Sequence, residues 1–525
     1  ILEGTLSSNA TLIQRNVAGI NNIAYIVDQL TIASNAVFTI SPGVVIKFLQ
    51  YYSTIDVFGA LVAQGLPTNK IIFTSFPDDS NGGDTNNDGN ATAPAAGNWE
   101  GIDFQASSAD SLNLMKNCEF RYGGWEGYAS NYEYGCIRAF SAKTVIDSCV
   151  ITQSSTSALG CFGSASPTFT HLQINNIALQ PVAMSMFSNP TFGFDTALNI
   201  GYMALGIIPE TYSLTDTIPI RSFAGYDTIT YYFYNTCTIN SGTTITIPAG
   251  VVFKGAGINF LYVNGALVVN GTSTNPVVFT DSRDDSKGHP GDSNQDGSLT
   301  KPTIDGNYDI YFADVSNDTA NTIKHALFRY ALEGCYMLSA SPTIVGCTFN
   351  YDTWGVWLGG VSNPALDSCT FNNLTYAPIN TSLVSYPKET IADIISGTTF
   401  KMIGVITETL VQDVTLTKRN FAGVTNIPYF FQTYTIGSGA TLTISPGVIL
   451  KFNTGGNIDV NKGLIANGGS TADSTIVFTS YMDDFYGGDS NSDSSATSAS
   501  SNYYYGWGGI TFENQSLDPL CQLKN

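Results

Sequence analysis

The chain contains few basic residues. It has 21 Lys and Arg residues against 42 Asp and Glu residues over a length of 525, which gives a formal net charge of -21. Proteins that bind nucleic acids or anionic membrane surfaces use stripes of Lys and Arg to contact phosphates, and the sequence has no such stripe. We therefore expect neither nucleic acid nor a lipid surface among its partners.

Long apolar runs and metal-type cysteine pairs are also absent from the sequence. No apolar stretch approaches the ~18 residues that a transmembrane helix needs, so we expect no membrane insertion. The nine cysteines are an odd number, and none stands in a Cys-x-x-Cys pair, which argues against a zinc site. Small apolar thiols fit a narrow interior. We expect buried free cysteines, with a disulfide between Cys347 and Cys369 as the alternative.

Residues that typically carry catalysis are scarce. The three histidines are His171, His289 and His325, and we expect the first and last of these to be structural. The Gly-His-Gly and Arg-Ile-Lys motifs typical of polygalacturonase-like enzymes are missing. Basic residues do recur in equivalent places, where pairing with a carboxylate at a strand end is the expected role, so the sequence predicts no enzyme in this segment. These residues are Lys47, Lys254, Lys451, Arg15, Arg221 and Arg419.

Aspartate is plentiful in three similar loops, which we call the acidic loops. Each has a pair of aspartates and then oxygen-bearing side chains at alternate positions, as in Asp84-Thr85-Asn86-Asn87-Asp88. A turn that directs several carboxylates inward suits a hard cation, and calcium prefers oxygen ligands of this kind. The sequence therefore predicts three Ca²⁺ sites. The candidate ligands are Asp78, Asp79, Asp84, Asn86 and Asp88; Asp284, Asp285, Asp292, Asn294 and Asp296; and Asp483, Asp484, Asp489, Asn491 and Asp493.

The Asp-x-Asn-x-Asp-Gly core is similar to the first half of an EF-hand loop, but the second half departs from that pattern. A bidentate Glu should stand at position twelve, and the chain has Ala95, Thr303 and Ser500 there. We expect the upstream aspartate pair to supply the missing charge, with Glu100 or Asp309 as further contributors in the first two copies. The alternative is three solvated loops that bind nothing.

Similar segments recur along the chain with a period of about 200 residues. The run 15–19 returns at 221–225 and 419–423, and the run 41–48 returns at 248–254 and 445–452. These matches divide the chain into a unit at 1–205, a unit at 206–403 and an incomplete third unit at 404–525. We expect the chain to be a window of a longer repetitive protein.

Within each unit, pairs of apolar residues separated by one position recur about every sixteen residues. Two inward residues flanking an outward one describe a short strand, and Gly, Pro and Asn between the pairs indicate turns. One strand in every such interval is the pattern of a solenoid coil. The pairs are Phe38/Ile40, Ile55/Val57, Ile71/Phe73, Ile245/Ile247, Leu261/Val263 and Val277/Phe279.

These segments, with Ala440–Val448 and the Cys-x-Phe strands at Cys347–Phe349 and Cys369–Phe371, resemble the right-handed parallel β-helix repeat family. The resemblance covers essentially the whole chain and is greatest to the subgroup in long secreted proteins of Bacteroidota. It implies an all-β, right-handed parallel β-helix with calcium-loop insertions, an extracellular or cell-surface location and a type 9 secretion route. For function it is weak, since this solenoid hosts lyases, hydrolases, adhesins and stalks.

Repetition without a catalytic constellation favours a calcium-stabilised structural stalk or adhesin of a bacterial cell surface. The alternative is a β-helix that binds or cleaves polysaccharide. Aromatic residues that could stack on sugar rings lie at Trp125 with Tyr128, Tyr132 and Tyr134, and at Trp354 with Trp357. Surface glycans or neighbouring copies of the chain are therefore candidate partners. Further aromatic residues stand at Tyr503–Tyr505, and we expect Trp99 and Trp507 to cover the acidic loops.

Overall fold

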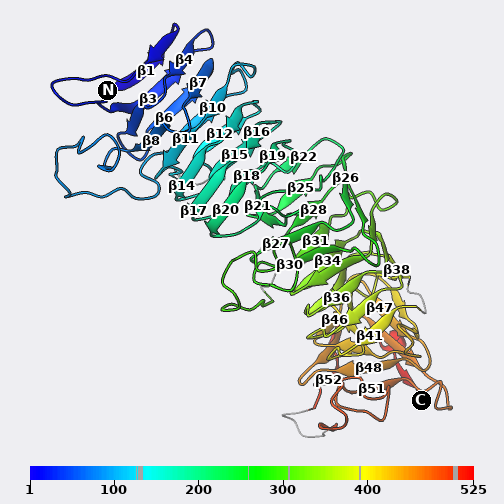
Figure 1. Cartoon of the computed structure of the whole chain (residues 1–525). Coiled ribbons are helices and arrows are strands. Elements are labelled where there is room, and N and C mark those ends of the chain that lie inside the picture. The colour runs from blue at the N-terminus through cyan, green and yellow to red at the C-terminus, as the bar shows by residue number, and fades with distance from the viewer. Residues whose placement is uncertain are drawn as a thin grey trace.

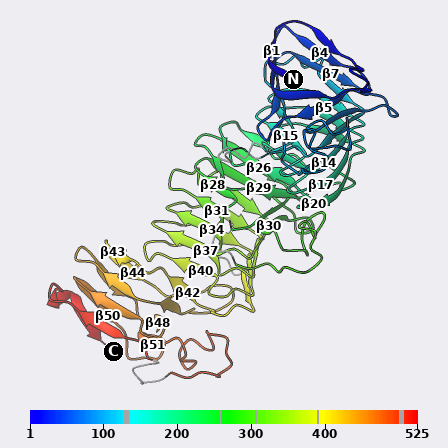
Figure 2. The ribbon, with the colours of Figure 1, turned by 90° about the vertical axis from the view of Figure 1, so that its left-hand side faces the viewer.

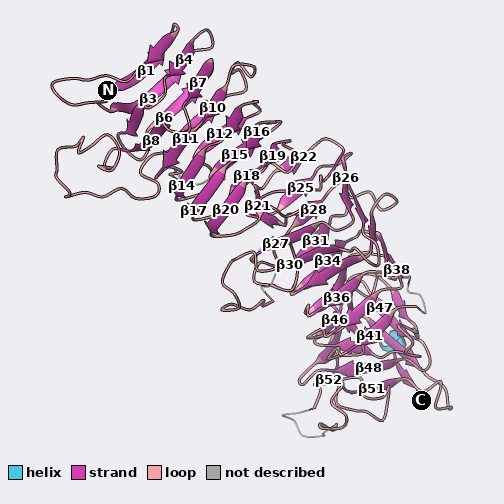
Figure 3. Ribbon diagram, viewed as in Figure 1, coloured by secondary structure: helices cyan, strands magenta, loops and turns pink. Residues whose placement is uncertain are grey.

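The chain forms an elongated solenoid of short parallel strands (Figure 1, Figure 3). This computed structural model describes residues 1–125, 127, 134–257, 259–304, 308–388, 392–499 and 506–524, and only the backbone of Tyr308. Within these ranges the one helical element is a single 3₁₀ turn, Asp518–Leu520, and no helix is long and apolar enough to span a membrane. The two termini lie at opposite ends of the rod (Figure 2). The predicted all-β parallel solenoid is confirmed.

Three ladders of parallel strands form the walls of the first unit. One contains β8 (Ile71–Ser75), β11 (Cys118–Arg121), β14 (Val150–Ser154), β17 (Gln173–Ile177) and β20 (Thr196–Ile200). The second contains β6 (Thr54–Val57), β9 (Gly101–Phe104), β12 (Ile137–Phe140), β15 (Leu159–Phe162), β18 (Val182–Met184) and β21 (Leu205–Ile207). The third contains β4 (Val37–Ile40), β7 (Ala60–Gln64), β10 (Leu114–Lys116), β13 (Val145–Asp147), β16 (Thr168–Thr170) and β19 (Thr191–Gly193).

The second unit has the same three-walled construction. Its first ladder contains β30 (Val277–Asp281), β33 (Ala326–Arg329), β36 (Thr348–Asn350), β39 (Thr370–Asn372) and β41 (Ile394–Ser396). The second contains β25 (Cys237–Ile239), β28 (Leu261–Val263), β31 (Tyr308–Phe312), β34 (Glu333–Leu338), β37 (Trp354–Gly359), β40 (Ile379–Thr381) and β42 (Ile403–Val405). The third contains β26 (Thr244–Pro248), β29 (Ala266–Asn270), β32 (Thr322–Lys324), β35 (Thr343–Val345) and β38 (Ala365–Asp367).

Hydrogen bonding between strands continues across both unit boundaries. At the first boundary β21 pairs with β24 (Tyr231–Phe233), and β24 pairs with β27 (Val252–Gly255). At the second, β42 pairs with β45 (Tyr429–Phe431), β45 with β48 (Ile449–Phe452) and β48 with β51 (Val477–Ser480). The units are therefore segments of one continuous rod rather than separate beads.

The interior is built from the apolar pairs that the sequence pattern identified. Each of the six pairs lies on a strand, and its members are 0–4% exposed. Phe328, Phe349 and Phe371 form a face-to-face column with ring centroids 4.9 Å and 5.1 Å apart. Gly334 is required beside this column, because a Cβ there would lie 2.5 Å from the Phe349 ring.

All nine cysteines are free thiols. Eight are buried, and Cys521 is partly exposed. Burial raises the pKa of Cys369, which lies beside Cys347 with no bond between the two sulfurs. The expectation of buried free thiols is confirmed, and the alternative disulfide is not formed.

Candidate metal centres

The three acidic loops leave the solenoid at the same place in each unit. The first occupies residues 76–100 between β8 and β9, the second follows β30, and the third lies between β51 and β52 (Gly509–Phe512). These segments project beyond the stacked strands (Figure 1). The loops begin at the ends of β8, β30 and β51. In the neighbouring coil these strands pair with β5 (Val45–Phe48), β27 and β48, respectively.

A fully buried lysine on that neighbouring strand holds each loop against the rod. The ammonium of Lys254 donates to the main-chain carbonyls of Asp284 (2.9 Å) and Gly291 and to Ser293 Oγ (2.9 Å). Lys451 makes the equivalent three contacts, and Lys47 donates to Gly83 O at 2.7 Å. Burial lowers the pKa of Lys254 to about 8, against the opposing effect of the nearby aspartates. The expected direct lysine–carboxylate pair is therefore wrong for the described residues, in which the ammonium groups donate to main-chain carbonyls and serine hydroxyls while the aspartates act only through their charge.

Two of the three recurring arginines also contact main-chain carbonyls. Arg221 donates to the carbonyls of Met186 and Ser188, and Arg419 donates to that of Pro387. Arg419 also lies 4.0 Å from the centroid of the Tyr386 ring. Arg15 is exposed. These contacts fasten a turn to the preceding coil.

The first aspartate of each pair turns inward and closes the start of its loop. Asp78 accepts hydrogen bonds from Thr74 Oγ1 (2.6 Å), from Ser80 and from Asn81 Nδ2 (3.1 Å). Burial raises the pKa of Asp78, but these hydrogen bonds outweigh burial and lower it overall. Asp284 and Asp483 accept equivalent bonds from the threonine four positions earlier.

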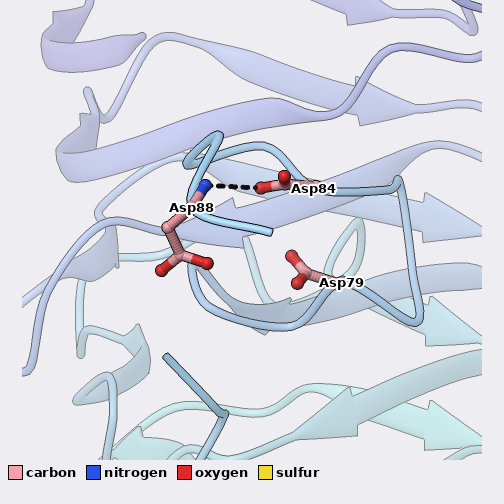
Figure 4. A group of neighbouring side chains, drawn as sticks. All are labelled: Asp79, Asp84 and Asp88. Carbon is pink, nitrogen blue, oxygen red and sulfur yellow. Dashed lines mark hydrogen bonds between the residues drawn. The ribbon is translucent and has the colours of Figure 1, made fainter. Parts of the chain in front are cut away.

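The second aspartate of each pair joins two further aspartates of the loop. The carboxylates of Asp79, Asp84 and Asp88 converge on one space (Figure 4), with one oxygen of each within 4.8 Å of the others. The same relation holds for Asp285, Asp292 and Asp296, and for Asp484, Asp489 and Asp493. The structure thus brings together three of the predicted acids in each copy, and places Asp78, Asp284 and Asp483 outside the group.

Main-chain hydrogen bonds fix the turn that carries these acids. Asp84 accepts from the backbone N–H of Asp88 (3.1 Å) and of Gly89 (3.0 Å), and Gly89 has φ +75°. In the third copy Ser494 replaces this glycine, with φ +56° at Ser492 and +55° at Ser494, and it still donates to Asp489 (3.2 Å). The third loop therefore has the same turn although it lacks the glycine.

An asparagine and a threonine that recur in all three loops complete each group. Asn86 Nδ2 donates to Asp88 Oδ2 (2.8 Å) and to Thr92 Oγ1 (2.9 Å), and the Thr92 hydroxyl donates to the same Asp88 oxygen. The threonine was not predicted, although it stands eight residues after Asp84 in the first loop, and the same spacing repeats in the other two copies. The equivalent contacts involve Asn294 with Thr300, and Asn491 with Thr497.

Six oxygen atoms in the three groups are buried and have no hydrogen-bond partner. Asn491 is one of the residues concerned and is only 8% exposed. An unpaired buried oxygen costs free energy, and the same two positions are unpaired in all three copies, where a cation could use them as ligands. The atoms are Oδ1 of Asp79, Asn86, Asp285, Asn294, Asp484 and Asn491.

In the second and third groups, burial and the charges of neighbouring carboxylates raise the pKa of one aspartate. Burial, followed by the charges of Asp292 and Asp296, raises the pKa of Asp285. Burial and the corresponding neighbours, Asp489 and Asp493, likewise raise that of Asp484. A divalent cation would relieve this repulsion, and an all-oxygen donor set with three carboxylates suits Ca²⁺ better than a softer metal.

Several other predicted contributors lie elsewhere. Glu100 accepts from Arg138 Nη2 (2.9 Å), and Asp309 is buried in the interior. Trp99 is fully buried and stacks on Phe48 at 4.0 Å, so it belongs to the core and does not cover a loop from outside. Tyr128, Tyr132, Ser500 and Tyr503–Tyr505, to which the sequence analysis gave a role, lie outside the described residues.

No protein-family model, no curated protein and no solved structure matches the chain. Its class is therefore defined by its own fold and loops. It is a parallel β-solenoid in which an acidic turn with three converging carboxylates recurs once in every unit.

Proposed function

We propose that the chain is a calcium-stabilised structural rod, and that each acidic loop binds one Ca²⁺. The observation that carries this proposal is the recurrence of one donor set, with the same orphaned oxygens, in three structurally equivalent loops. The donors in each copy are the second aspartate of the pair, the two later aspartates and the asparagine between them. The first aspartate acts as a positioning residue that orients its neighbour.

The second and third acidic loops also connect successive units, which supports a structural role. The backbone N–H of Met203, at the end of the first unit, donates to Ser293 O in the second acidic loop (2.6 Å). At the next boundary Lys401 N donates to Ser490 O (2.8 Å), and Ser492 Oγ donates to Thr398 O (2.9 Å). Ordering the loop with a cation would thereby stiffen the rod at the boundary between its units.

The proposed setting is the surface of a bacterium of the Bacteroidota, with export by the type 9 route and a role as stalk or adhesin. The support is the sequence resemblance together with calcium dependence, which suits an extracellular medium rich in that ion. An enzyme would use one unrepeated site, whereas the acidic groups recur with the architecture. A polysaccharide-cleaving activity is accordingly not the function that we propose.

Calcium binding is tested by counting bound ions and by thermal unfolding of the full 525-residue chain. We expect three Ca²⁺ per chain, and two for the double variant Asp285→Asn/Asp296→Asn. Each site at a calcium concentration of 100 Kd would add about 2.7 kcal/mol to the folded state, so EGTA should lower the midpoint followed by circular dichroism. The double variant Asp216→Asn/Asp227→Asn, at two exposed aspartates outside the loops, is the charge-matched control. A chain that binds no calcium and melts identically with and without EGTA would refute the proposal.

A further inference from the structure

An outward-facing column of aromatic rings runs along the second ladder of unit two and stops abruptly. Tyr262, Tyr311, Tyr336 and Trp357 stand in register on β28, β31, β34 and β37, and successive ring centroids are 4.6, 5.0 and 6.0 Å apart. On the next two strands the same positions are Asn380 and Gly404. One face of the Trp357 indole is therefore covered by Tyr336, while the next two positions of the column hold no ring.

A cavity of about 430 Å³ opens where the column stops. Trp357 forms one wall and Trp354 lies nearly perpendicular to it, with centroids 6.0 Å apart and planes at 86°. Phe430, which follows Gly404 in the register, lies on the far side. Gly404 is required here, because a Cβ would lie 2.7 Å from both Asn380 Oδ1 and the Trp354 ring. The volume is in the range of small-ligand pockets.

At the first unit boundary a tyrosine ring lies over the corresponding glycine, where the second boundary has the Trp354 ring. At the first boundary Gly206 pairs with Tyr232 on the next strand, as Gly404 pairs with Phe430 at the second boundary. Tyr234, two residues after Tyr232, places its ring over Gly206, with atoms 2.7–2.9 Å from the position of a Cβ. At the second boundary Gln432 takes the place of Tyr234 and lines the cavity.

The polar groups of the cavity are neutral. Asn380, Thr407 and Gln432 line it together with the aromatic and aliphatic side chains, and none of the described residues that line it is charged. Asn380 is 3% exposed, and its Oδ1 has no hydrogen-bond partner. An uncharged lining in a chain of net charge -21 does not suit an anionic ligand.

We propose that this cavity binds one neutral hexose ring of a glycan. The apolar C–H face of a pyranose would stack on the part of the Trp357 indole that lines the cavity, and its hydroxyls would exchange hydrogen bonds with the amides of Asn380 and Gln432. This combination of an aromatic platform with a few polar groups is what recognition of an amphipathic ring requires. The site is independent of calcium binding by the acidic loops.

The test is isothermal titration and tryptophan fluorescence of the full chain, in calcium-containing buffer, with neutral gluco-, galacto- and manno-oligosaccharides. Polygalacturonate serves as the anionic counterpart. Trp357→Ala should weaken binding about tenfold or more. Gln432→Tyr, which copies residue 234, should abolish it by filling the cavity. Tyr262→Ala, at the other end of the same column, should leave the affinity within about twofold.

Circular dichroism of each variant establishes that the solenoid is intact. The proposal is overturned if no neutral oligosaccharide binds at millimolar concentration, or if Trp357→Ala and Gln432→Tyr bind as the parent chain does. It is equally overturned if N-acetyltryptophanamide binds the cavity and the sugars do not, because the occupant would then be an aromatic side chain of a protein. Since calcium counting is a separate measurement, failure here leaves the metal sites untouched.

Discussion

Replacing Lys254 by Met should release the second acidic loop from the rod. The fully buried ammonium has three acceptors: two main-chain carbonyls of the loop, at Asp284 and Gly291, and the hydroxyl of Ser293. Hydrogen bonds from a charged donor contribute about 1.5–3 kcal/mol each. Against this stands a net penalty on the charged form of about 3 kcal/mol, because burial outweighs the attraction of the nearby aspartates and lowers the pKa of Lys254 to about 8. In Lys254→Met the closed state of the loop should therefore lose about 3 kcal/mol of stabilising free energy relative to the open state.

Hydrogen–deuterium exchange is the appropriate assay, because a repeat protein of this length opens locally rather than in one global step. A loss of about 3 kcal/mol corresponds to roughly a 100-fold rise in the opening equilibrium. Amides at 282–296, measured in EGTA, should exchange faster by that factor in Lys254→Met. Lys301→Met removes the same charge from an exposed position of the same loop and should leave exchange unchanged. Equal exchange in the two variants would refute the anchoring role.

Two further predictions address single side chains. Thr300→Val removes the hydroxyl that donates to Asp296. It should weaken Ca²⁺ binding about 10-fold or more, as loss of a ligand-orienting group commonly does. Calcium titration measures this affinity, and an unchanged value would contradict the prediction. Burial raises the pKa of Glu333 from 4.5 to about 7, so the folded state retains a proton that the unfolded state has lost. Stability contributed by this group should fall as pH rises from about 4.5 to about 7, by about 3 kcal/mol. In Glu333→Gln the free energy of opening of β34, obtained from hydrogen–deuterium exchange, should no longer change with pH across that range. A pH dependence that persists in this variant would point to another group.

The fold was predictable because its signal is local and repeated. Each coil buries two residues that flank an outward one, so pairs such as Leu261/Val263 identify the strands without any knowledge of their neighbours. The acidic loops were predictable for a similar reason, since the order of their carboxylates recurs three times.

What escaped prediction depends on contacts between coils. Asp78 and Asp79 are adjacent in sequence, yet only their relation to Thr74 and to the loop separates the inward residue from the converging one. The buried lysines were expected to meet carboxylates, because the sequence does not reveal that main-chain carbonyls of the loop turn toward them. Trp99 was assigned to the loop, whereas its stacking on Phe48 comes from the coil below.

The aromatic column was also concealed from the sequence. Tyr262 and Tyr311 are separated by the whole second acidic loop, although they stand 4.6 Å apart in space. A linear period cannot detect neighbours when an insertion of that length lies between them. The register between β28 and β31 in the structure shows that Tyr262 and Tyr311 are neighbours.

The bonds from Met203 to Ser293 and from Lys401 to Ser490 give the rod a direction. In both cases the loop belongs to the later unit and the group that it satisfies belongs to the earlier one. Each unit thus depends on its successor to complete its last turn. Shortening the chain from its C-terminal side would therefore fray the unit that remains, and a chain that folds as it emerges would finish each unit only after the next one has arrived.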